Sequence, residues 1–337
     1  MSLNTVKCPR CYSNKLYKFG FDKQDNQKYQ CQDCKRQFTE KSNPYFKKSH
    51  YPVCPRCSHK TYLHHKYEHY NRFKCGNRQC NHILVKYHSI NINPTSNHLI
   101  DGSTSLKGMR YPLHVVLLAL NLYFNNNSST RNIAHLFEIS FNINVSHVTI
   151  YKWTIKFSKL FRELSEFYSE KLNFDSDDWH ADETAVFIKG KRYYLWLVID
   201  SETRFVLAYH LTQSRGESSA FSVINSAKRL GTSKNVITDR LPSYNEALKV
   251  LLPNSKHIAV TPKSSDINNN LIESFNKTFK AWYKCKKGFN SFESANKLIS
   301  NFLFNYNFLR PHGSLNNLTP ANVAGFNSNT NSWFLSA

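Results

Sequence analysis

The chain has 337 residues, of which 40% are hydrophobic and 14% aromatic, so it can bury at least one sizeable core and form two or three domains. Its 45 basic residues outnumber 23 acidic ones, and the net charge of +22 indicates a polyanionic partner, with nucleic acid as the first candidate. The longest apolar run, residues 113–120, is too short to span a membrane, and no apolar signal segment precedes Cys8. These features argue against a membrane or secreted protein and predict a cytoplasmic one with reduced thiols.

Eight of the nine cysteines lie in pairs within the first 80 residues. The first four are Cys8, Cys11, Cys31 and Cys34, and the second four, offset by 46 residues, are Cys54, Cys57, Cys75 and Cys80. Two CxxC turns that face each other supply four thiolates in the tetrahedral arrangement that Zn²⁺ prefers. The duplication predicts one zinc ribbon in residues 1–49 and another in residues 50–93, each with a structural Zn²⁺ that contributes folding energy.

The ligands of the second zinc site stay open at this stage. Its last pair, CGNRQC, is two residues wider than a CxxC turn, and nearby histidines could replace a cysteine: His59, His64, His65, His69 and His82. The ninth cysteine, Cys285, lies far from both modules and is expected to have no metal role.

The first 110 residues are strongly basic. They contain 20 lysines and arginines but only 6 acids, and aromatic residues such as Tyr12, Phe19 and Tyr29 are interleaved with the cations. That mixture suits contacts with phosphates and stacking on bases. The alternative is a solvated basic surface around two small modules.

A polar stretch, residues 94–110, is expected to be a linker to a helical region, residues 111–172. Helices are predicted over Tyr111–Phe124, Thr130–Glu138 and His147–Leu160, with serines in position to cap the last two. In the third helix, Val148, Ile150 or Tyr151, and Ile155 are expected to pack, whereas His147, Thr149 and Lys152 are expected to point outward near its start. This layout is typical of a DNA-binding helix-turn-helix, although a three-helix scaffold would give similar periodicity.

From Trp179 the pattern changes to strands alternating with helices. Three strands joined by tight turns are expected from Trp179, over Tyr193–Asp200 and over Arg204–Leu211. They are followed by a helix (Glu217–Leu230), a strand (Asn235–Asp239), a helix (Ser243–Leu251), a strand (His257–Val260) and a helix (Asn268–Lys284). Residues 173–325 are therefore predicted to form a mixed five-stranded α/β domain with the strand order of ribonuclease-H-like folds, before a tail at 326–337.

Three acids fall at informative places in this order. Asp182 lies in the first strand, Asp239 ends the fourth, and Glu273 lies on the following helix. The first and fourth strands are neighbours in such a sheet, so Asp182 and Asp239 are expected side by side with Glu273 brought over them. Clustered carboxylates repel unless cations bind, and hard oxygen ligands suit Mg²⁺ or Mn²⁺. Glu183 is expected on the opposite face from Asp182, and Asp200 in a turn.

The predicted helix that carries Glu273 has two faces. Asp266 can cap its start, and four apolar side chains share one face: Leu271, Phe275, Phe279 and Trp282. The opposite face carries Glu273, Asn269, Asn276, Lys277, Lys280 and Lys284. An apolar-rich helix, Phe289–Phe308, is expected next, to close the core or to pair subunits.

Four segments in this part of the chain resemble the insertion-sequence DDE transposases of the retroviral-integrase superfamily, most closely the IS-six group. They are DETAVFIKGKRYYLWLVID, VITDRLPSYNEAL, NNNLIESFNKTFK and NFLRPHGSLNNLTPANV. The resemblance implies that Asp182, Asp239 and Glu273 bind the catalytic metals and that Lys280 lies toward DNA near the cleavage point. It also implies an N-terminal region that recognises terminal inverted repeats, and a dimer or larger assembly on double-stranded DNA.

The sequence thus predicts a nucleoid-associated transposase. It would bind its element ends through residues 1 to about 170 and cleave and join DNA by a two-metal mechanism, with water and then a 3′-hydroxyl as nucleophiles. Lys277, Lys280 and Lys284 are expected to hold the DNA backbone. A nuclease or resolvase on the same fold is one alternative, and a non-catalytic DNA-binding regulator is another.

Overall fold

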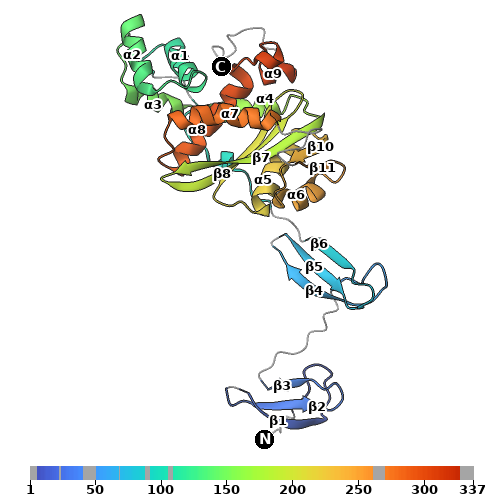
Figure 1. Ribbon diagram of the computed structural model, residues 1–337. Helices are drawn as coiled ribbons and strands as arrows, with labels where there is room; N and C mark the ends of the chain where they lie inside the picture. The colour runs from blue at the N-terminus through green and yellow to red at the C-terminus, as the bar shows by residue number, and fades with distance from the viewer. Residues whose placement is uncertain are drawn as a thin grey trace. The chain divides into compact units, whose positions relative to one another are not determined.

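A computed structural model describes residues 6–22, 24–40, 51–67, 69–87, 92–104, 109–260 and 270–326. The chain divides into two compact units, residues 1–90 and residues 91–337 (Figure 1). Within the described ranges, no helix combines the length and apolar character that crossing a bilayer requires.

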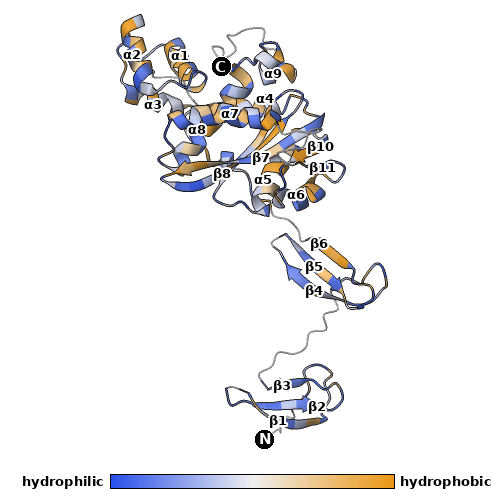
Figure 2. Cartoon of the chain, viewed as in Figure 1, coloured by the Kyte–Doolittle hydropathy of each residue, from blue (hydrophilic) through white to orange (hydrophobic). Residues whose placement is uncertain are grey.

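The first unit contains two small antiparallel sheets of three strands each, in the orders β1-β2-β3 and β4-β5-β6. Their strands are β1 (Leu16–Phe21), β2 (Gln27–Cys31), β3 (Gln37–Thr39), β4 (Thr61–Lys66), β5 (Tyr70–Cys75) and β6 (Ile83–Tyr87). The core of the first sheet is small: Cys8, Cys31 and Phe38 are buried, and a few half-buried side chains pack around them. Most residues of this sheet are hydrophilic (Figure 2). So little apolar burial cannot by itself stabilise a module of this size.

The second unit contains helices at the three places predicted for its helical region, and a fourth follows them. The three are α1 (Leu113–Phe124), α2 (Thr130–Phe141) and α3 (His147–Lys156), and the fourth is α4 (Ser158–Ser169). Ser129 and Ser146 accept bonds from the backbone N–H groups of Asn132 and Thr149 and so cap α2 and α3.

Two details of the third predicted helix are wrong. It does not continue to Leu160, because the backbone leaves helical geometry at Phe157 and a separate helix, α4, starts at Ser158. Val148 does not pack, since it is half exposed, while Ile150 and Trp153 are buried.

The predicted mixed five-stranded sheet is present, in the order β11-β10-β7-β8-β9. Its strands are β7 (Ser176–Ile188), β8 (Lys191–Asp200), β9 (Val206–Thr212), β10 (Ser233–Thr238) and β11 (Lys256–Ala259). β7, β8 and β9 form the antiparallel part, and β10 runs parallel to both β7 and β11. The first and fourth strands are therefore neighbours, as expected.

Helices cover both faces of this sheet (Figure 1). α5 (Glu217–Lys228) and α6 (Ser243–Leu251) pack on one face, and α7 (Asn270–Cys285) and α8 (Phe292–Phe304) lie on the other. α8 runs into a π-helical turn, Asn305–Leu309, so the predicted helix to Phe308 ends in a widened turn. A 3₁₀ turn, Gly313–Leu315, and α9 (Pro320–Val323) complete the described chain.

Helix α7 has the two faces that the sequence predicted, with two differences. Phe275, Phe279 and Trp282 are buried. Ile272 rather than Leu271 completes the buried stripe, and Asn276 is buried instead of lying on the polar face. Asp266, Asn268 and Asn269 lie outside the described residues.

The helical region α1–α4 packs directly on α7 and α8. The Trp282 ring lies 6.3 Å from the Tyr123 ring and 5.9 Å from the Phe124 ring of α1. The Asn301 amide of α8 donates to the Thr154 carbonyl of α3 at 2.7 Å. These buried contacts join the predicted helical and catalytic regions in one unit.

The expected linker also packs on the sheet. Its short 3₁₀ helix η1 (Ser96–Leu99) places Ser96 against the edge strand β9, where the Ser96 hydroxyl accepts from the Leu211 N–H at 2.9 Å. The Ser96 N–H donates to His210 Nδ1 at 3.0 Å. Residues 95–100 thus cover an otherwise open sheet edge, which a free linker would not do.

Candidate active site

Asp182 and Asp239 meet where β10 ends. The last paired residues of β10 and β7 are Thr238 and Ala181, so Asp182 extends just past the end of β10 and Asp239 is the next residue after it. Carboxylate oxygens of Asp182, Asp239 and Glu183 all lie within 4.8 Å of one another. The prediction that neighbouring strands bring Asp182 and Asp239 together is confirmed.

Asp182 is held from the α7 side of the sheet. The Asn276 amide of α7 donates to its Oδ2 at 2.8 Å. The pKa of Asp182 is raised to about 6, chiefly by burial and also by the negative charge of Asp239, while the Asn276 bond and the Lys280 charge oppose the rise. A bound cation would strongly stabilise the ionised form of such a carboxylate, because it offsets both the burial and the repulsion from the second acid.

Glu183 joins this group from the other face. Arg215 Nε donates to Glu183 Oε1 at 2.7 Å, and the Tyr244 hydroxyl of α6 donates to Oε2 at 3.4 Å. Only 2% of its side chain is exposed, and burial raises the pKa of Glu183 to about 7 despite the bond from Arg215. Strand alternation predicted that Glu183 lies on the opposite face of the sheet from Asp182, but not that its carboxylate reaches Asp182 and Asp239. It reaches them because β10 has ended at this point, so no strand separates the two faces beside β7.

Asp239 is fixed by its own turn. Its Oδ1 accepts the Leu241 N–H at 2.9 Å, so it starts the turn after β10 while its carboxylate stays in the acidic cluster. Asp200, expected in a turn, is instead the buried last residue of β8, and its Oδ2 accepts the Thr203 N–H of the turn that follows at 2.8 Å.

Glu273 is not part of the acidic cluster. It is exposed in the first turn of α7, and Asn276, three residues further along, is the α7 residue that contacts Asp182. Three residues correspond to about 4.5 Å along a helix, so Glu273 lies one turn before the contact. The chain that leads into this turn, residues 261–269, is outside the described ranges.

The predicted DNA-contacting residues differ in exposure. Lys277, Lys280 and Lys284 are exposed on α7, and Lys280 is close enough to Asp182 to lower the pKa of that acid. On α3, His147 and Lys152 are exposed. Thr149 is half-buried, and its hydroxyl lies 2.9 Å from the Ser146 hydroxyl that caps the helix.

The eight N-terminal cysteines form two compact clusters. In each cluster the four Sγ atoms lie within 4.8 Å of one another. The Sγ atoms of Cys8 and Cys34 are 3.5 Å apart, as are those of Cys11 and Cys31, and those of Cys54 and Cys80 are 3.8 Å apart. A tetrahedron of thiolates around Zn²⁺ places sulfurs about 3.8 Å apart, given Zn–S bonds of about 2.3 Å. The spacing therefore fits a zinc site and not disulfides.

The backbone of the cysteine turns repeats in both modules. The first cysteine of each turn donates its N–H to a carbonyl just after the turn: Cys8 to Ser13, Cys31 to Arg36, Cys54 to His59 and Cys75 to His82. The wider CGNRQC turn keeps this closing bond and accommodates its two extra residues within the loop. Cys80 can therefore reach the cluster, and no histidine belongs to it among the described residues.

Comparisons with known proteins agree with this geometry. Residues 176–312 match the DDE domain of IS240-type transposases. The transposase of the insertion-sequence-like element IS431mec from Staphylococcus aureus is 30% identical over 160 residues, which cover 47% of this chain and 69% of that protein. The transposase of IS257 in transposon Tn4003 from the same species gives the same values.

Solved structures of low identity were also matched. The catalytic core of HTLV-2 integrase in complex with magnesium shares 17% identity at a TM-score of 0.34, covering 44% of this chain and 95% of that one. The catalytic core of BIV integrase shares 15% identity at a TM-score of 0.34, covering 44% and 92%. The sequence relatives identify the chain, which belongs to the DDE transposases of insertion sequences and is a polynucleotidyl transferase.

Proposed function

We propose that this transposase binds the terminal inverted repeats of its own mobile element, cleaves the DNA strand at the element end and joins the freed end to target DNA. The observation that carries the proposal is the meeting of Asp182 and Asp239 at the end of β10, with oxygens within 4.8 Å. Two acids supplied by adjacent parallel strands, with cations on a neighbouring helix, suit chemistry on a phosphodiester.

Asp182, Asp239 and Glu273 would hold Mg²⁺ or Mn²⁺, and the oxygen-only donor set fits these hard cations. When bound, the metals lower the pKa of an attacking water or hydroxyl and neutralise charge on the phosphate. Asn276 orients Asp182 by its 2.8 Å bond, and Lys280, one helical turn further along α7, places a cation beside the reacting phosphate. Water serves as the nucleophile for cleavage, and the freed 3′-hydroxyl serves for joining.

Residues 1 to about 170 would recognise the element ends. Two structural Zn²⁺ ions in the cysteine clusters stabilise the ribbons, and exposed His147 and Lys152 at the start of α3 reach the DNA in the helix-turn-helix reading. Thr149 contributes less, because its hydroxyl is engaged in the cap of its own helix. The protein would act as a dimer or larger assembly on paired ends, in the nucleoid.

The central test replaces Asp239 with Asn and measures joining of pre-cut element ends to a target plasmid in Mg²⁺. We expect joining to fall below detection while end binding persists, because the substitution removes a metal ligand and leaves the fold unchanged. Asp177→Asn is the matched control, since Asp177 is an exposed acid on the neighbouring strand β7 whose carboxylate pairs with Lys234. Joining by Asp239→Asn at the control's level would refute the mechanism.

A second test compares Glu273 with Glu183 as the third metal-binding carboxylate. Glu273→Gln and Glu183→Gln are assayed for joining and for the rise in melting temperature on adding Mn²⁺, which reports metal binding without activity. We expect Glu273→Gln to lose joining and to reduce the Mn²⁺ effect. The opposite result, loss only in Glu183→Gln, would transfer the metal-binding role to Glu183.

Two other functions predict different products. A nuclease or resolvase on this fold would cut ends without joining pre-cut ones, so joined product separates it from a transposase. A non-catalytic regulator would bind ends but never nick them in Mg²⁺ or Mn²⁺. The packed acidic cluster favours catalysis over regulation, because a regulator gains nothing from buried acids that repel one another.

A further inference from the structure

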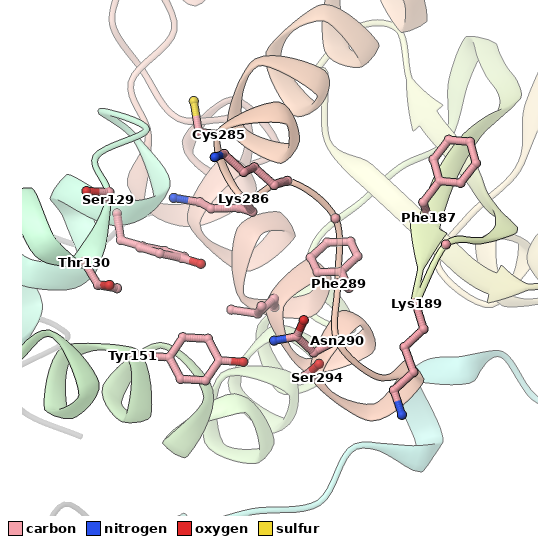
Figure 3. Close-up of a pocket in the computed structure, with 15 residues that line it drawn as sticks. Ser129, Thr130, Tyr151, Phe187, Lys189, Cys285, Lys286, Phe289, Asn290 and Ser294 are labelled. Atoms are coloured by element: carbon pink, nitrogen blue, oxygen red, sulfur yellow. The ribbon is translucent and has the colours of Figure 1, made fainter.

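Away from the acidic cluster, a cavity of about 550 Å³ lies where the α1–α3 helices meet the loop after α7 and the β7–β8 hairpin (Figure 3). Its walls carry lysines and hydroxyl groups, and among the described residues none that lines it is acidic. The polar and charged lining residues are Ser129, Thr130, Tyr151, Lys189, Lys286, Lys287, Asn290 and Ser294. A cavity of this size with cations and no acids suits an anion.

Lys286 is the best-defined cation of this cavity. It reaches from the loop after α7 toward the start of α2 (Figure 3), where its Nζ donates to the Ser128 carbonyl at 3.2 Å. The same Nζ lies 3.5 Å from the centre of the Tyr123 ring. An ammonium has three donors, so these two contacts leave capacity for an anion. Burial lowers the pKa of Lys286 to about 8, and a bound anion would favour its charged form.

The cavity walls are held in place before any ligand binds. The Phe289 N–H donates to the Phe187 carbonyl at 3.0 Å, and the Lys189 N–H donates back to the Phe289 carbonyl at 2.9 Å. Gly288, which immediately precedes Phe289, has a φ of +93°, and a Cβ there would come within 3.3 Å of the Phe187 carbonyl. These bonds fix the loop after α7 to the β7–β8 hairpin, so the cations on both lie on a preorganised frame.

A row of cations connects this cavity to the acidic cluster. Asn276 contacts Asp182, and Lys280 and Lys284 continue its helix face at four-residue spacing. The end of α7, where Lys286 and Lys287 follow, lies about 14 Å along the helix from Asn276. That distance is less than half a turn of B-DNA, so one DNA segment can reach both places.

We propose that this cavity binds a backbone phosphate of the same DNA segment whose reacting phosphodiester lies at the acidic cluster, with Lys286 and Lys287 as its cations. The inference rests on the proposed function, since it requires DNA at Asp182 and Asp239. The junction between the helical region and the sheet would then bind DNA. DNA held there bridges the part that recognises ends and the part that cuts them.

The first test is chemical protection of the full-length protein. Amine-reactive labelling followed by mass spectrometry is carried out on three samples. They are the protein alone, the protein with a 40-base-pair duplex that carries the element end, and the protein with inorganic phosphate at matched ionic strength. We expect the duplex to reduce labelling of Lys286 and Lys287 several-fold and to leave the exposed Lys228 of α5 unchanged. Equal labelling with and without duplex would overturn the proposal. Equal protection by inorganic phosphate alone would replace it with a small-anion site.

The second test is the salt dependence of duplex binding. Each lost phosphate contact lowers the slope of log K against log salt by about 0.9. Lys287→Gln, which removes the charge of an exposed side chain, is expected to lower the slope by about that amount, and Lys228→Gln is expected to leave it unchanged. An unchanged slope in Lys287→Gln and in Lys286→Gln would refute the site. Joining that is lost in Asp239→Asn but normal in both lysine variants would leave the proposed function intact.

Discussion

The cysteine modules and the α/β unit are stabilised in different ways. In the first module the buried core is two cysteines and Phe38. In the α/β unit, one residue, Trp282, has ring neighbours on three helices: Phe124 of α1 at 5.9 Å, Phe279 of α7 at 5.7 Å and Phe302 of α8 at 4.8 Å. The first region depends on ligands for a metal, and the second on the area of apolar surface that it removes from water.

This difference shows why the two regions can serve different tasks. A small module stabilised by a metal keeps almost all of its surface available for contacts. A unit with a dense aromatic core can instead hold acids buried and close together, as at Asp182 and Glu183, because the surrounding packing offsets their mutual repulsion.

Removal of zinc should produce the largest change. Structural zinc contributes on the order of 10 kcal/mol in small modules, more than their cores can supply. We expect a strong chelator, or Cys8→Ser together with Cys54→Ser, to abolish hydrogen-exchange protection in β1–β6 while β7–β11 stay protected. Cys285→Ser is the matched control, since this exposed thiol lies outside both clusters. Protected β1–β6 amides after complete zinc removal would contradict the distinction between the two regions.

Trp282→Ala should act on the other region. Removing a fully buried tryptophan costs about 3–5 kcal/mol, and here the cavity would open between α1, α7 and α8. We expect the urea midpoint of the α/β unit to fall accordingly, with the zinc content of the protein unchanged. Ile139→Ala, at a position that is 66% exposed on α2, should change the free energy of unfolding by less than about 0.5 kcal/mol.

Acidification should weaken the α/β unit through His210. Burial lowers its pKa to about 4 in the folded protein, against 6.5 for an ordinary histidine, and its Nδ1 accepts the Ser96 N–H. The unfolded chain therefore binds a proton first as the pH falls, so stability that is present above pH 6.5 is lost progressively toward pH 4. The expected loss by pH 4.5 is about 2.5 kcal/mol.

The matched variant for that measurement is His210→Gln, whose amide oxygen can accept the same bond but does not titrate. Urea midpoints of both proteins are compared at pH 7 and pH 4.5. We expect the variant to lose less stability than the wild type on acidification. Identical pH dependence in the two proteins would show that His210 is not the titrating group.

Much of the architecture could be predicted from local pattern. Hydrophobic periodicity and capping residues act over a few neighbours in the sequence. They therefore predicted the strands from Trp179 onward, helix α6 and the serine caps of α2 and α3. The pairing of Asp182 with Asp239 was also predictable, since the strand order makes β7 and β10 neighbours. The repeated cysteine pairs predicted both clusters, because metal geometry fixes the spacing of its ligands.

Other features depend on contacts between distant segments. Glu183 belongs to the acidic cluster because Arg215 and Tyr244 hold it there, and Asn276 is buried because it reaches Asp182. The polar stretch around Ser96 became a cover for the edge of β9 instead of a linker. None of these partners is near in sequence, so no local pattern records them. The amino-acid sequence by itself determined the family, the sheet order and the cysteine clusters, whereas only tertiary packing decided which polar side chains converge on the acids and on the basic cavity.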